Sequence, residues 1–180
     1  QTLAGDFGFT PAATASGAGV VVTASRVTLA LGGQAAVATL TEGTGTLVLT
    51  PAGLAGQLGG TVRVTVPGVE FGGAFGVRLN NTAAAVKETG LGLDLPAGPY
   101  LHVRGVGAQL RVLGQSLSGD FTLEQVNTSD GARVTRVVAV GVQLALGDGT
   151  ADWVKVSEGQ GTFVVTPDGQ TVVIGGLMQN

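Results

Sequence analysis

Apolar and polar residues alternate along most of the chain, and this alternation predicts β-strands. In Thr61–Val66 (TVRVTV) three valines share one face and two threonines and an arginine share the other, as in a half-buried strand. Other segments rich in β-branched residues are Val20–Leu31, Gly45–Thr50, Tyr100–Arg104, Gln109–Leu113, Arg133–Leu146 and Gly161–Thr166. Turn sequences such as GG, PG, PAG and PDG separate them, so the chain predicts consecutive antiparallel hairpins.

The sequence repeats itself with a long period. Three pairs of segments correspond at spacings of 114, 115 and 116 residues: Leu3–Phe7 with Leu117–Phe121, Val27–Gly32 with Val142–Gly147, and Gly43–Pro51 with Gly159–Pro167. Residues 1–64 are therefore similar to residues 115–180, and residues 65–114 are intervening strands. We expect one elongated all-β unit over residues 1–180, built as a β-sandwich or as a β-solenoid or β-roll. It would be cut from a longer array or completed by a neighbour.

A short kernel, an apolar residue on each side of a glycine at a spacing of two, recurs within this period. Its three full copies are Leu3, Gly5 and Phe7; Phe71, Gly73 and Phe75; and Leu117, Gly119 and Phe121. Variants occur at residues 54–58 and 174–177. A glycine in the middle of a strand predicts a β-bulge or a close approach of two backbones.

The segment Leu49–Phe75 (LTPAGLAGQLGGTVRVTVPGVEFGGAF), followed by NNT and LDLPAGPYLHVRG, resembles the β-strand-rich tandem repeats of very large exported bacterial surface and adhesin-like proteins. The resemblance implies an extracellular or cell-surface location and an adhesin-like or surface-layer-like, calcium-tolerant role. It implies no active-site residues.

Composition narrows the possible functions. Charged residues make up 12% of the chain, hydrophobic residues 44%, and the net charge is −3, so the chain should fold and carry a weakly charged surface. The few basic residues are scattered, which argues against a nucleic-acid partner. No apolar run is long enough for a transmembrane helix. The absence of cysteine, and a first residue that is Gln1 and not Met, suit an exported, processed protein.

The sequence offers little material for catalysis, and we expect no enzyme. Its single histidine, His102, alternates with Leu101 and Val103 and should lie on a strand surface. Tyr100, His102 and Arg104 share one face of that strand and could contact a ligand. The plainer interpretation is an ordinary surface strand.

Two further motifs each have two interpretations. Asp148 and Asp152 (DGTAD) could bind calcium through carboxylate oxygens, or form an Asp-Gly hairpin turn. The sequences 80–82 (NNT) and 127–129 (NTS) match glycosylation sequons, or make turns.

Taken together, the sequence favours a non-enzymatic structural or adhesive module. Its partners would be other copies or adjacent repeats, joined by strand pairing into a filament or surface array, or components of a cell surface or matrix. The alternative is a module that binds carbohydrate or protein through the face of Tyr100, His102 and Arg104.

Overall fold

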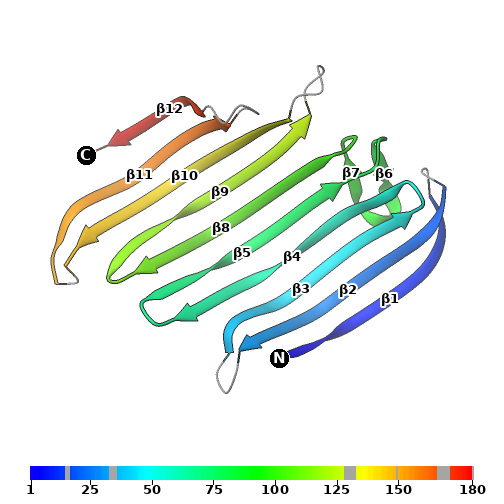
Figure 1. The fold of residues 1–180 in the computed structure, drawn as a ribbon, viewed down its shortest axis with the longest axis horizontal. Coiled ribbons are helices and arrows are strands. Elements are labelled where there is room, and N and C mark those ends of the chain that lie inside the picture. The colour runs from blue at the N-terminus through cyan, green and yellow to red at the C-terminus, as the bar shows by residue number, and fades with distance from the viewer. Residues whose placement is uncertain (15–16, 33–35, 128–132, 149, 166–170, 180) are drawn as a thin grey trace.

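A computed structural model describes residues 1–14, 17–32, 36–127, 133–148, 150–165 and 171–179. They form an antiparallel sheet of ten strands arranged in chain order, and β5 pairs with β8 (Figure 1). The strands are β1 (Thr2–Thr14), β2 (Gly17–Gly32), β3 (Ala36–Thr50), β4 (Gly53–Val66), β5 (Val69–Asn80), β8 (Tyr100–Val112), β9 (Gln115–Asn127), β10 (Arg133–Gly147), β11 (Asp152–Val165) and β12 (Thr171–Gln179). The prediction of an all-β chain of consecutive antiparallel hairpins is confirmed, and this main sheet is open.

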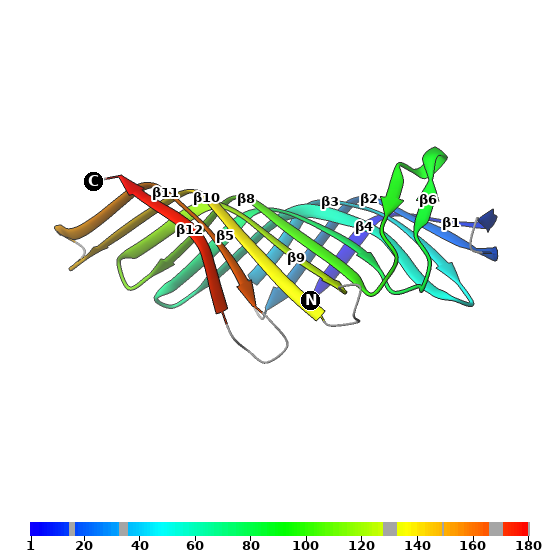
Figure 2. The same ribbon diagram turned by 90° about the horizontal axis from the view of Figure 1, so that it is seen from above.

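Between β5 and β8 the chain leaves the main sheet and forms a second, two-stranded sheet. β6 (Val86–Glu88) pairs with β7 (Leu93–Leu95), and a 3-10 turn at Thr89–Leu91 joins them. This β6–β7 hairpin rises from one side of the main sheet (Figure 2).

The hydrophobic core lies between the β6–β7 hairpin and the main sheet. It consists of two clusters: Ala55, Val86, Leu95 and Tyr100, and Val21, Val48 and Leu93 with Ala12 and Leu91 packed beside them. Among the described residues, every buried apolar side chain larger than alanine belongs to these clusters. The core is therefore confined to the area that the hairpin covers.

Asn80 and Thr82 attach the hairpin to the sheet. The Asn80 side-chain amide donates hydrogen bonds to the carbonyls of Ala84 (2.8 Å) and Pro96 (2.7 Å). Its Oδ1 accepts from the backbone N–H and the hydroxyl of Thr82 at 2.9 and 2.8 Å. Asn80 is 1% exposed, so the structure supports the turn interpretation of this sequon. The sequon at 127–129 lies partly outside the described residues.

The main sheet has one polar and one apolar face, because residues directly opposite on antiparallel strands point to the same side. The polar face carries the hairpin. One row on it runs across seven strands through Thr23, Thr46, Gln57, Arg78, His102, Glu124 and Arg136. A row on the apolar face runs across nine strands through Phe7, Ala24, Gly45, Leu58, Val77, Val103, Leu123, Val137 and Phe163.

A line of β-bulges crosses the sheet near the middle of its strands. Residues with left-handed backbone conformation occur in five strands: Arg26, Glu42, Gly107, Gly141 and Glu158, with φ between 52° and 60°. Kernel glycines lie against these bulges. A Cβ on Gly73 would approach the Ala108 Cα to 2.9 Å, and one on Gly119 would approach the Val142 Cα to 3.2 Å. The close backbone approach expected from the kernel occurs at both positions.

Positions that correspond in the long sequence period have matching backbone conformations. Gly5 and Gly119 have φ of 157° and 154°, Arg26 and Gly141 have 52° and 60°, and Glu42 and Glu158 both have 55°. The third kernel glycine, Gly73, has φ 155°. The bulges therefore recur at the sequence spacing.

The attachment of the hairpin gives a first prediction. Asn80→Ala should lower the free energy of unfolding by about 3 kcal/mol, because it removes the hydrogen bonds that Asn80 supplies to the Pro96 carbonyl and the Thr82 N–H and leaves the Ala84 carbonyl with the Thr82 hydroxyl as its donor. Urea denaturation followed by circular dichroism measures the change. Asn81→Ala is the matched control, since Asn81 is exposed and its Oδ1 accepts one bond, from the Leu54 N–H at 2.6 Å. Equal losses in the two variants would contradict the anchoring role of Asn80.

Candidate functional site

Tyr100, His102 and Arg104 lie on the polar face of β8, but in different surroundings. Tyr100 is 7% exposed and belongs to the core under the β6–β7 hairpin. His102 is half-buried, and Arg104 is exposed. The three residues therefore do not make one exposed stripe, and His102 and Arg104 are the two that a partner could reach directly.

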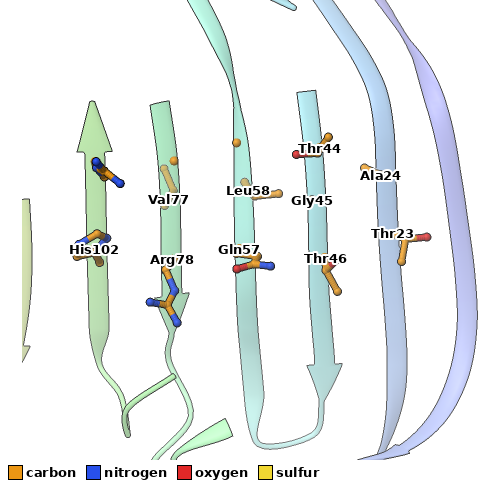
Figure 3. Close-up of a pocket in the computed structure, with 13 residues that line it drawn as sticks. Thr23, Ala24, Thr44, Gly45, Thr46, Gln57, Leu58, Val77, Arg78 and His102 are labelled. Carbon is orange, nitrogen blue, oxygen red and sulfur yellow. The ribbon is translucent and has the colours of Figure 1, made fainter. Parts of the chain in front are cut away.

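A groove of about 650 Å³ lies on the polar face beside these two residues. It crosses β2, β3, β4, β5 and β8, and Arg78 on β5 and His102 on β8 lie at one end of it (Figure 3). Arg104 also lines the groove. Polar side chains from Thr23, Thr44, Thr46 and Gln57 line the remainder together with small and apolar residues. The strand alternation places His102 and Arg104 here, whereas Arg78 and Gln57 join them through strand register. The sequence analysis missed these last two, although Arg78 alternates with Val77 and Leu79.

The groove is positively charged. Its lining contains two arginines and a histidine but no carboxylate. Among the ion pairs of the described residues none involves Arg78 or Arg104. An Arg78 Nη2–H donates to the backbone carbonyl of Asp94 in β7, and its buried Nε has no hydrogen-bond partner in the described part of the chain. Glu124, opposite His102, forms an ion pair with Arg136.

The floor of the groove is formed by backbone. Thr44, Gly59, Gly76 and Arg104 are consecutive in one row of the polar face. A Cβ on Gly59 would come no closer than 3.5 Å to the Phe75 carbonyl oxygen, and one on Gly76 no closer than 4.0 Å to that of Leu58. Neither glycine has a positive φ. Packing within the chain therefore leaves room for side chains at both positions.

Asp148 and Asp152 are engaged in other contacts. Asp148 Oδ1 accepts hydrogen bonds from the Thr150 N–H (2.9 Å), the Thr150 hydroxyl (2.6 Å) and the Ala151 N–H (2.9 Å). These bonds, that of the Thr150 hydroxyl first, lower the pKa of Asp148 to about 2. Asp152 lies 3.1 Å from the Lys155 Nζ. The described residues contain no group of three His, Cys, Asp or Glu side chains that could hold a metal ion.

The apolar face is a second candidate surface, and it is uncovered. No member of its nine-strand row is buried, and Phe7 and Leu58 are 47% and 41% exposed. The chain exposes 10997 Å² in total. A compact monomer of 17.7 kDa would expose about 7,900 Å², so roughly 3,000 Å² are exposed beyond that expectation.

Comparison of the chain with protein-family models, with curated proteins and with solved structures finds no match. In the described residues no helix has the length and apolar character needed to cross a membrane.

The surroundings of Tyr100 give a second prediction. Burial raises its pKa, the nearby Glu124 carboxylate raises it further, and Arg78 opposes both. The folded protein thus keeps the phenol proton at a pH where the unfolded chain, with a pKa of about 10, loses it. Stability should fall as pH rises above about 10.

Tyr100 is the single tyrosine of the chain, so the ultraviolet absorbance of phenolate reports its titration directly. Glu124→Gln should move the titration toward lower pH, and Tyr100→Phe should remove this contribution to alkaline unfolding. Titration of the folded protein at or below the pH of free tyrosine would show that the phenol is not held in the core.

Proposed function

We propose that this chain is a non-enzymatic structural module of a layered β-assembly, in which the apolar face of one copy packs on the apolar face of a second. The observation that carries the proposal is the row of apolar residues from Phe7 to Phe163 across nine strands, none of them buried. Two sheets joined in this way form a β-sandwich whose layers lie about 10 Å apart.

The size of the face suits a stable contact between copies. Strands spaced about 4.8 Å apart, most of them 12–16 residues long at about 3.3 Å per residue, give the ten-stranded sheet a face of roughly 2,000 Å². A standard protein interface buries about 800 Å² on each partner, and obligate ones bury more and are more apolar. A contact on this scale would remove much of the excess exposure of the isolated chain.

The distribution of charged residues on the sheet also supports the apolar face as the contact surface between copies. In β4, β5 and β9 every charged residue lies at a polar-face position: Arg63, Glu70, Arg78, Asp120 and Glu124. Two apolar faces can therefore meet in these strands without burying an unpaired charge, which would cost several kcal/mol. A second copy presents the same uncharged face, so the two surfaces are complementary.

The sheet edges offer a second direction of growth. β1 and β12 each pair with one neighbour in the described sheet, and an edge strand can pair with another chain. We place this module in an extracellular or cell-surface assembly, a filament or an array, in line with its resemblance to exported repeat proteins. Edge pairing extends each layer, and face packing joins two layers.

Light scattering over a concentration series tests the proposal. The chain should be a dimer or larger, and Leu58→Lys should raise the dissociation constant at least about 100-fold, since each contact would then bury two lysines in place of two leucines. Thr65→Lys is the matched control. It adds the same charge to β4 at an exposed polar-face position, opposite Glu70, and should leave the mass unchanged.

A chain that stays monomeric at every concentration would refute the proposed assembly. If larger species form but Leu58→Lys does not reduce their mass, the copies associate through another surface, such as the strand edges. If Thr65→Lys dissociates the assembly as strongly as Leu58→Lys, added charge and not the apolar face is responsible.

A further inference from the structure

We infer that the groove on the polar face binds an acidic oligosaccharide, with Arg104 and Arg78 contacting its carboxylate or sulfate groups. The proposed contact between copies uses the other face of the sheet, because the side chains of Arg78 and Arg104 and those of the apolar row point to opposite faces.

Charge indicates an anionic ligand. Arg78 and Arg104 are diagonal neighbours on β5 and β8, since Arg78 is opposite His102 and Gly76 is opposite Arg104. The Cα atoms of diagonal neighbours lie about 7–8 Å apart, so both arginines belong to the same part of the polar face. No carboxylate among the described residues forms an ion pair with either arginine. An anion in the groove would balance these two positive charges, and the guanidinium fork matches carboxylate and sulfate geometry.

The glycine floor indicates a ligand that approaches the sheet closely. Gly59 and Gly76 have space for a side chain and no positive φ, so the fold does not require glycine at either position. Glycine in a strand weakens it, and such a residue often marks the close approach of a ligand. Side chains at these positions would fill the groove directly beside Arg104.

The lining favours a saccharide over a peptide. Backbone hydrogen bonds of a sheet lie in its plane, so a peptide on the sheet face could not pair its backbone with β4 or β5. Sugar hydroxyls can instead pair with the side chains of Thr44, Thr46 and Gln57. The groove lining contains no Phe, Tyr or Trp ring on which a neutral sugar could stack, so charge is the main feature it can recognise. Five strands at about 4.8 Å make a path of roughly 19 Å, long enough for several sugar units.

Isothermal titration calorimetry with tetragalacturonate, at low and at moderate salt, tests the inference. Binding is expected, weaker at higher salt, and absent with neutral maltotetraose. Arg104→Gln should weaken binding about tenfold or more by removing a charged contact. Gly76→Val should weaken it at least as much by filling the floor while both arginines remain.

Arg111→Gln is the matched control, because Arg111 lies on the same face of β8 beyond the Gly107 bulge and outside the groove. It should change the affinity less than twofold. Thermal melts should show that all three variants remain folded. We choose Arg104 over Arg78 for substitution, since Arg78 also bonds the β6–β7 hairpin.

Several outcomes would overturn the inference. Failure of tetragalacturonate to bind at low salt would exclude an acidic-sugar site. Equal binding of a tetraglutamate peptide would show that the groove does not select saccharides. An equal loss in Arg111→Gln would show diffuse attraction to the whole face, and tight binding by Gly76→Val would place the ligand elsewhere.

Discussion

The two-faced sheet depends on β-bulges that occur in line on neighbouring strands. Side chains alternate with a period of two, so one extra residue in a strand sends every later side chain to the opposite face unless the sequence shifts with it. In β2 the apolar-face residues are Val22 and Ala24 before Arg26, and Leu29 and Leu31 after it. The change from even to odd numbers keeps Val22 and Ala24 on the same side of the strand as Leu29 and Leu31.

Strands that lack a left-handed residue accommodate the bulges of their neighbours through small residues. In β5 the apolar face is formed by odd-numbered residues from Val69 to Leu79 without interruption, and Gly73 lies against the bulge of β8. The ring of Phe75 lies over Gly105, where a Cβ would approach the ring to 2.8 Å. An aromatic side chain thus covers backbone that a glycine leaves exposed, on a face with no second layer.

The two sides of the sheet differ in how much apolar surface they bury. The β6–β7 hairpin covers a core on one side, whereas the apolar face on the other side is exposed in the described residues. The hairpin satisfies its own polar groups through Asn80 and Thr82 and buries its apolar residues on the polar face. Nothing comparable covers Leu58 or Val103 among the described residues. Because burial of apolar area is the main favourable term in folding, a sheet of this shape gains most from a partner on its apolar face.

Sequence patterns predict local features of this fold better than its long-range ones. Alternation in Thr61–Val66 and the turn sequences identify strands and hairpins, because both depend on a few neighbouring residues. The β6–β7 hairpin was not predicted, since its strands are three residues long and are held by contacts with distant ones. The sequence pattern predicted only some of the residues that line the groove. His102 and Arg104 share a strand, but Arg78 and Gln57 join them only through register, which no local pattern specifies.

Strand alternation also explains how one thin sheet can carry two separate surfaces. Val77 and Arg78 are adjacent in sequence, yet their side chains point to opposite faces, that of Val77 to the apolar row and that of Arg78 to the polar row. A change of side chain at one position therefore alters one surface and leaves the other largely intact, as long as the register is kept. Register is kept by the turns and the bulges together with the alternation of apolar and polar residues along each strand. Each surface can thus vary in chemistry without loss of the strand pairing on which both depend.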